Sequence, residues 1–166
     1  YDRQGDTDKS LVQMEAILKL SPDNVDAMNY IGYTWTQKGI RLNDAEKLLK
    51  KALQLKPNNA YIQDSWGWHL FVMGRISEAV VELEKAVQLK PDESTILEHL
   101  ADAYLRKNLR EKALAKYLDA LKYTDDAVLK EKLEIKLQNL RTEMAQENND
   151  NQDKNKIRVP AANNNE

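Results

Sequence analysis

Two histidines and two adjacent acid pairs are the residues of this sequence that could carry acid–base or metal chemistry. His69 and His99 are 30 residues apart, and neither belongs to a Glu-x-x-His or His-x-x-x-His pattern, the kind of spacing that places two metal ligands on one helix face. Both histidines are therefore interpreted as helix-surface residues without a special partner. The pairs at 92–93 and 125–126 stand where helices are expected to begin, and acids there complement the helix dipole.

Other catalytic signatures are missing from the sequence. It contains no glycine-rich phosphate loop and no Gly-x-Ser-x-Gly motif. The absence of cysteine excludes thiol nucleophiles and cysteine-ligated metals. We therefore expect a protein that is not an enzyme and that has no cofactor, no catalytic residues and no metal site.

The composition favours helices joined by short loops. The 166 residues include 22 leucines and 16 alanines but only 5 glycines and 4 prolines, too few turn residues for a fold rich in β-strands. A net charge of −2, with lysines that alternate with glutamates on expected helix surfaces, argues against nucleic acid as a partner. No apolar run approaches the ~18 residues that a membrane span needs.

An internal repeat organises the middle of the chain. The segments Leu53-Gln54-Leu55-Lys56-Pro57 and Val87-Gln88-Leu89-Lys90-Pro91 are 34 residues apart and nearly identical. Small residues recur with the same period, at Ala45, Ala79 and Ala113 and again at Ala52, Ala86 and Ala120. Such small residues allow two helices to approach closely. A 34-residue period with these features resembles the tetratricopeptide repeat, over roughly residues 8–125.

This resemblance implies an all-α fold, a right-handed α-solenoid of antiparallel helix pairs with about three and a half repeats and a C-terminal capping helix. In each pair, Gly39, Gly74 or Asn108 is expected to end the first helix in the left-handed conformation. The expected divisions are the second helix of a truncated repeat (1–24), three repeats (25–59, 60–93 and 94–125), a capping helix (126–147) and an asparagine-rich flexible tail (148–166).

The expected capping helix carries one apolar stripe, formed by Leu129, Leu133, Leu137, Leu140 and Met144. We interpret the stripe as the face that covers the last repeat, because solenoids need a terminal element with a polar outer surface. A coiled-coil dimerisation seam is the alternative, although the stripe is short for a self-sufficient coiled coil.

The family's concave groove, lined by the first helix of each repeat, is the expected binding site for an extended peptide. Positions two, five, nine and twelve of a helix share one face, which supports the grouping independently. Trp35 and Trp66 fall on packing positions instead. The expected groove residues are Asp26, Asn29, Tyr33, Gln37, Tyr61, Asp64, Trp68, Val72, Glu98, Asp102 and Leu105.

The charge of this groove predicts the kind of partner. Members of the family that bind chaperones hold a terminal carboxylate with basic residues, but three of the corresponding positions here are the acids Asp64, Glu98 and Asp102. The resemblance therefore implies a protein or peptide partner with basic and apolar side chains, rather than an acidic one. Trp68, at the centre, is expected to be the main contact.

Self-association is the alternative function. It would use the open N-terminal face and the tail segment 154–160. The three basic residues of this segment are opposite in charge to the acidic groove, and its two β-branched residues and proline favour an extended shape. The amino-acid sequence of the repeats resembles that of bacterial secreted or lipoprotein-type members of the family. This favours a soluble periplasmic or membrane-tethered location over a cytoplasmic one, without fixing the compartment.

Overall fold

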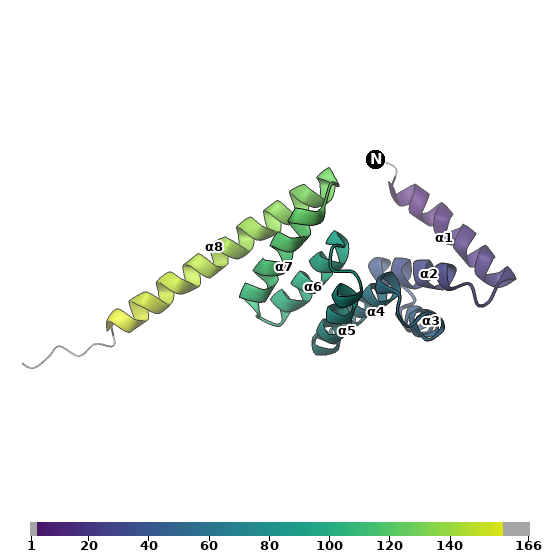
Figure 1. The fold of residues 1–166 in the computed structure, drawn as a ribbon, viewed down its shortest axis with the longest axis horizontal. Coiled ribbons are helices and arrows are strands. Elements are labelled where there is room, and N and C mark those ends of the chain that lie inside the picture. Colours follow the sequence, from purple (N-terminus) through teal and green to yellow (C-terminus); the bar gives the residue numbers. More distant parts are fainter. Residues whose placement is uncertain (1–2, 158–166) are drawn as a thin grey trace, which may run out of the picture.

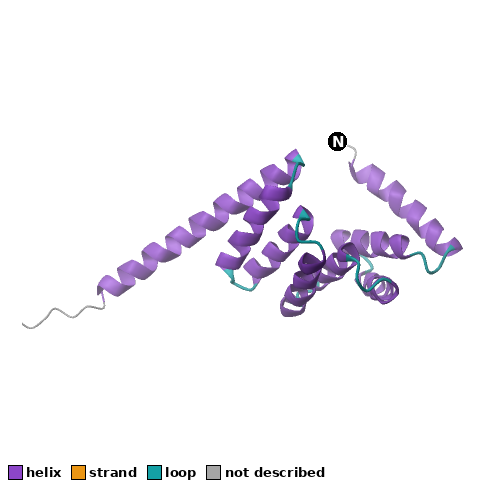
Figure 2. Cartoon of the chain, viewed as in Figure 1, coloured by secondary structure: helices purple, strands orange, loops and turns teal. Residues whose placement is uncertain are grey.

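The computed structural model describes the backbone of residues 3–157 and the side chains of residues 6–149. Within residues 3–157 every regular element is a helix, as Figure 2 shows. Their order along the chain is α1 (Arg3–Leu20), α2 (Val25–Lys38), α3 (Leu42–Leu55), α4 (Ala60–Val72), α5 (Ile76–Leu89), α6 (Ser94–Arg106), α7 (Arg110–Tyr123) and α8 (Ala127–Ile157).

The helices pair in sequence and the pairs stack into an elongated all-α solenoid (Figure 1). Helices α2 and α3, α4 and α5, and α6 and α7 form the three pairs, whose members make the most extensive contacts. The first helices α2, α4 and α6 also contact one another in order. Helix α1 packs against α2 at one end of the array and α8 packs against α7 at the other.

Small residues with the 34-residue period bring the paired helices together, as the sequence predicts. All six recurring alanines are fully buried: Ala45, Ala52, Ala79, Ala86, Ala113 and Ala120. A Cβ added at Gly32 would lie 2.6 Å from Leu49 Cγ, and one at Gly67 would lie 2.7 Å from Leu83 Cγ. Both distances are far below a normal van der Waals contact, so glycine is required for this helix separation.

The ends of the helices follow from local chemistry. Gly39, Gly74 and Asn108 all adopt positive φ, at 64°, 76° and 61°, which confirms the predicted left-handed conformation after the first helices. At the other end, the Asn24 side chain accepts a hydrogen bond from Ala27 N, and the Asn59 side chain accepts bonds from the first turn of α4. These signals mark where α2 and α4 begin and where all three first helices end, whereas α6 begins after Glu93 without a side-chain cap.

The apolar stripe of α8 packs into the core of the same chain. Leu133, Leu137 and Leu140 are almost completely buried against α6 and α7, and Leu129 and Met144 pack at the edges of that cluster. The stripe therefore serves as a cap in this structure, rather than as an exposed coiled-coil seam.

The helix boundary at 147 expected from the sequence is wrong, because α8 continues to Ile157. Residues 148–157, including Lys154–Ile157 of the segment that was expected to be extended, are helical. Asparagine does not favour helices, but Gln152, Lys154 and Lys156 among these positions have a higher helix propensity. The rest of the predicted tail, 158–166, lies outside the described residues.

Candidate functional site

The first helices bring five of the expected groove residues around one cavity of about 440 Å³. Its walls come from α2, α4 and the start of α6, with Met14 of α1 at one edge. Tyr61 is 48% exposed, and the carboxylate of Asp26 is open to solvent. We call this space the N-terminal cavity; the expected groove residues that line it are Asp26, Asn29, Tyr33, Tyr61 and Asp64.

Hydrogen bonds hold two of the three tyrosines that line the N-terminal cavity, Tyr33 and Tyr61, in place. The Tyr61 hydroxyl donates to Glu93 Oε2 at 3.0 Å and accepts from Lys90 Nζ at 2.5 Å. Gln37, another expected groove residue, donates from its amide to the Tyr33 hydroxyl at 2.6 Å. Burial raises the pKa of Tyr33 above its ordinary value, and the negative charges of nearby Asp64 and Glu98 act in the same direction. The hydrogen bond from Gln37 lowers the pKa but does not outweigh them. Both rings are thus held in fixed orientations, and the Tyr33 hydroxyl keeps its proton at pH 7.

Two polar atoms along this face have no hydrogen-bond partner among the described residues. Asn29 Oδ1, in the N-terminal cavity, and Trp68 Nε1, further along α4, are both buried and unpaired. Leaving such an atom unsatisfied costs free energy, about 1–3 kcal/mol for a buried neutral group. An incoming ligand with an N–H for the Asn29 oxygen would recover part of that cost.

Trp68 is more enclosed than the sequence predicts. Its indole stacks on the imidazole of His99, with ring centroids 4.2 Å apart, and on the ring of Phe71 at 4.7 Å. His99 is buried in turn, and its Nδ1 lies 2.9 Å from Asp64 Oδ1. The expectation that His99 has no special partner is wrong, because Asp64 and the indole together enclose it.

The acids in the second half of the groove are paired within the chain. Glu98 is only 2% exposed, and its Oε1 lies 2.8 Å from Lys132 Nζ and 2.7 Å from Lys136 Nζ. Asp102 also contacts Lys136, at 2.6 Å, and accepts a hydrogen bond from the Tyr117 hydroxyl. Burial pushes the pKa of Glu98 upward, but the two lysine contacts outweigh it and leave the pKa below its ordinary value. Helix α8 thus supplies the positive charge that a basic peptide would have brought.

The remaining expected groove residues are spread out. Leu105 lines a second cavity of about 340 Å³ between α6 and α8, with Asp102, Tyr117 and Lys136. Val72, at the end of α4, is 39% exposed and lines neither cavity. The predicted groove is therefore divided into an open N-terminal part and a C-terminal part that α8 closes.

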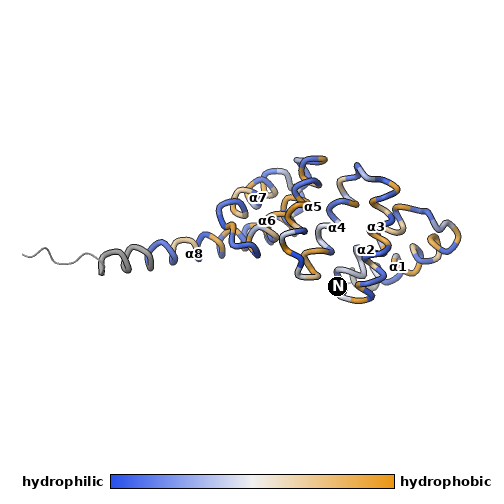
Figure 3. The backbone as a smooth tube through the Cα atoms, turned by 90° about the horizontal axis from the view of Figure 1, so that it is seen from below, coloured by the Kyte–Doolittle hydropathy of each residue, from blue (hydrophilic) through white to orange (hydrophobic). Residues whose placement is uncertain are grey.

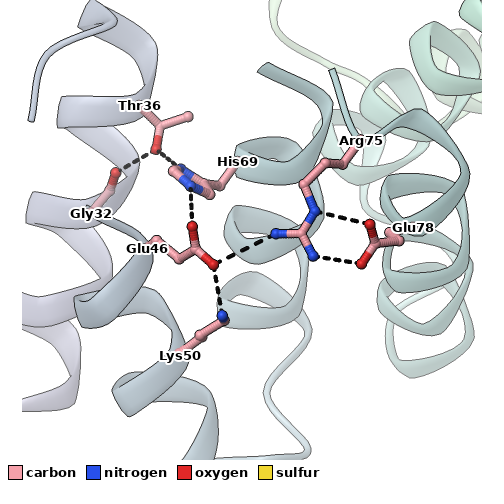
Figure 4. A network of polar contacts seen from close by, with 7 residues as sticks. All are labelled: Gly32, Thr36, Glu46, Lys50, His69, Arg75 and Glu78. Atoms are coloured by element: carbon pink, nitrogen blue, oxygen red, sulfur yellow. Dashed lines mark hydrogen bonds and ion pairs between the residues drawn. The ribbon is translucent and has the colours of Figure 1, made fainter. Parts of the chain in front are cut away.

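His69 lies on the other side of α4, in a polar network that joins two repeats (Figure 4). Thr36 Oγ1 donates to Gly32 O and therefore accepts from His69 Nδ1, both at 2.8 Å. The opposite nitrogen, Nε2, lies 3.9 Å from Glu46 Oε2. Burial lowers the pKa of His69, against the attraction of Glu46, so the ring is neutral at pH 7.

This network is structural and corrects the interpretation of His69 as a surface residue. His69 is fully buried, and Glu46 continues the network to Lys50, at 2.6 Å, and to Arg75, at 3.5 Å. Arg75 in turn pairs with Glu78 on α5. The chain of contacts ties the pair α2–α3 to the pair α4–α5.

Sequence reasoning missed the residues that come from outside the first helices. Lys132 and Lys136 are four residues apart beside the apolar stripe of α8, which marks them as neighbours on one helix face. That spacing alone does not show which acids they meet, because the answer depends on how α8 crosses α6.

A family model described as "Tetratricopeptide repeat" matches residues 1–60 and 65–127. The chain belongs to the tetratricopeptide-repeat family. The TPR repeat-containing protein PA4667 of Pseudomonas aeruginosa is 37% identical to it over 73 residues, which is 42% of this chain. The match spans 12% of that relative's length.

Solved tetratricopeptide-repeat structures have the same fold. The protein TTC0263 of Thermus thermophilus superposes with a TM-score of 0.69 at 20% identity, over 84% of this chain and 75% of that one. The type III secretion translocator chaperone SycD of Yersinia enterocolitica gives 0.66 at 16% identity, over 75% and 88%. MamA AMB-1 gives 0.56 at 28% identity, over 72% and 70%. These likenesses confirm the predicted solenoid.

The family's repeats are generally non-catalytic interaction modules. No group of three or more histidines, aspartates or glutamates that could hold a metal ion occurs within the described part of the chain. None of the helices in residues 3–157 combines the length and the apolar character required to cross a bilayer.

Proposed function

We propose that this chain is a protein-interaction module that binds an extended peptide with basic and apolar side chains along its concave face, chiefly in the N-terminal cavity. The observation that carries the proposal is the unpaired, buried Asn29 oxygen in a cavity walled by Tyr33 and Tyr61. An extended peptide offers backbone N–H groups to such an acceptor and lays its side chains on the rings.

The charges of the N-terminal cavity support a basic side chain at one position. Asp26 has a side chain 85% exposed, and its nearest cation, Lys56, is 3.8 Å away. Glu93 is engaged with Lys90 and Tyr61, and Asp64 with His99. The preference for positive charge therefore rests on Asp26, and we expect it to be weaker than three free acids would give.

Fluorescence anisotropy with two labelled peptides tests this proposal. The first copies residues 154–160 of this chain, Lys-Asn-Lys-Ile-Arg-Val-Pro, and the second replaces its three basic residues with glutamate. We expect the basic peptide to bind about tenfold more tightly, with an advantage that shrinks as salt rises because exposed charges are screened. Equal or tighter binding of the acidic peptide would contradict the proposal.

Substitutions locate the binding site. Asn29→Ala and Tyr61→Ala should each weaken binding of the basic peptide by about fivefold or more, as central interface residues do. Tyr123→Ala is the matched control, because Tyr123 is a similarly exposed tyrosine, 45%, at the end of α7 and outside both cavities. A loss of binding in the control as large as in Tyr61→Ala would place the peptide elsewhere.

The basic peptide also tests whether the tail can mediate self-association, because its sequence is that of residues 154–160. Lys154–Ile157 belong to α8 in this structure, so this use of the tail requires the end of the helix to unwind. A location in the periplasm or on a membrane tether of a bacterium stays a prediction that rests on the resemblance alone.

A further inference from the structure

A row of four aromatic rings connects the two cavities of the concave face. We call the cavity of about 340 Å³ between α6 and α8 the C-terminal cavity. Tyr33, which lines the N-terminal cavity, has its ring centroid 6.3 Å from that of His99. The His99 centroid lies 4.2 Å from that of Trp68, which lies 4.7 Å from that of Phe71, a residue of the C-terminal cavity. Tyr33, Trp68 and Phe71 are half-buried, so each keeps some exposed surface.

The length of α4 gives the separation of the two cavities. Tyr61, in the first turn of α4, lines the N-terminal cavity, and Phe71, in its last turn, lines the C-terminal cavity. A rise of 1.5 Å per residue places them about 15 Å apart along the helix. Figure 3 shows α4 between α2 and α6, the two first helices that it contacts. An extended chain rises by about 3.3 Å per residue, so it covers this distance in about four to five residues.

The C-terminal cavity suits an apolar side chain. Its walls include Leu105, which is half-buried, and the last ring of the row. Asp102 and Lys136 also line it, but they are 2.6 Å apart, so they neutralise each other. Arg106 and Glu143 supply one further charge of each sign. The cavity therefore favours neither a cation nor an anion, in contrast to the N-terminal cavity with its exposed Asp26.

We propose that one extended peptide spans both cavities across the row of rings, with a basic side chain in the N-terminal cavity and a large apolar side chain in the C-terminal cavity. This inference rests on the proposed function and specifies its ligand. Alternate side chains of an extended chain point the same way, so a separation of four positions turns both anchors toward the protein. The recognised sequence is therefore a basic and an apolar residue four positions apart.

Two anchors on one chain strengthen binding only if the chain between them spans the distance. Once one anchor is bound, the other is held near its own cavity at a high effective concentration. Anchors two positions apart reach only about 7 Å, less than half of the separation. A peptide of that kind can place one anchor at a time, so it gains nothing from the second.

Fluorescence anisotropy of the 166-residue chain with labelled serine peptides tests the spacing. Each peptide carries one lysine and one leucine, two or four positions apart, with either anchor first. We expect the four-position peptide to bind about tenfold more tightly, in one of the two orders. Asn139→Trp should remove this advantage, because Asn139 is exposed on α8 and lines the C-terminal cavity, which a tryptophan would fill. Gln138→Trp is the matched control, since Gln138 is also exposed on α8 but lines neither cavity, and it should keep the advantage.

The outcomes separate this inference from the proposed function. Equal binding of the two spacings, with Tyr61→Ala weakening both, would leave peptide binding in the N-terminal cavity intact and overturn the link between the cavities. An equal loss in Asn139→Trp and Gln138→Trp would also overturn it, and Glu143→Trp repeats the block at another exposed residue in case the first variant unfolds. If Tyr61→Ala changes nothing, the proposed function and this inference both fail.

Discussion

Lys136 of α8 places its Nζ 2.7 Å from Glu98 Oε1 and 2.6 Å from Asp102 Oδ1, both on α6. One lysine from the terminal helix thus neutralises two acids of the concave face. Glu98 is almost fully buried, so the contact also compensates a carboxylate that water does not reach.

Lys136→Met should therefore destabilise the protein more than the loss of a surface ion pair does. Lys132 remains near Glu98, so we expect a loss of about 1–3 kcal/mol in the free energy of unfolding, measured by urea denaturation. Lys85→Met is the control, since Lys85 pairs with Glu82 on an exposed helix face, and such pairs contribute little. Equal losses in the two variants would contradict the role given to Lys136.

The contribution of Glu98 to the pH dependence of stability should reverse sign when Lys132 and Lys136, the two lysines near it, are removed. In the wild type, the pKa of Glu98 is lowered, so its stabilising contribution is present above its ordinary pKa of about 4.3 and is lost as the pH falls below that value. In Lys132→Met/Lys136→Met, burial alone acts on Glu98 and raises its pKa. The deficit in unfolding free energy relative to the wild type should then shrink as the pH falls from 7 toward about 4; a deficit that grows would refute this account.

His69 should make the protein less stable in mild acid. Burial lowers its pKa, so the unfolded chain takes up a proton below about pH 6.5 while the folded chain does not, and stability falls by at most about 1.4 kcal/mol per pH unit. His69→Gln removes this titration. The difference in unfolding free energy between wild type and variant should be smaller at pH 5.5 than at pH 7.5, and because His99 is common to both proteins, its contribution cancels. A difference independent of pH would mean that folding leaves the pKa of His69 unchanged, and a larger difference at pH 5.5 would mean that the fold favours its protonated form.

The two tryptophans of α4 should differ in their effect on stability. Trp66 is 8% exposed and belongs to a core cluster, so Trp66→Ala should cost about 3–5 kcal/mol. Trp68 is half-buried, and Trp68→Ala would remove its two ring stacks, on His99 and on Phe71. The substitution should therefore lower the free energy of unfolding by about 1–3 kcal/mol. Thermal and urea unfolding measure both. If Trp68→Ala proved as costly as Trp66→Ala, Trp68 would belong to the core.

The sequence by itself determined the repeat and therefore the fold. Steric requirements are local and recur every 34 residues, so the buried alanines and the left-handed residues at Gly39, Gly74 and Asn108 could be predicted. The helical period also identified the face that carries Asn29, Tyr33 and Tyr61, which the structure brings to one cavity.

Only the tertiary structure decided which of those side chains are open to a ligand. Helical phase says which way a residue points, but the neutralisation of Glu98 and Asp102 depends on where α8 crosses α6, a contact between residues more than thirty positions apart. The burial of His69 and His99 likewise depends on partners one repeat away, Thr36 and Asp64. Such contacts leave no local pattern, because pairing between distant segments is fixed by the packing of whole helices and not by the spacing of residues along one of them.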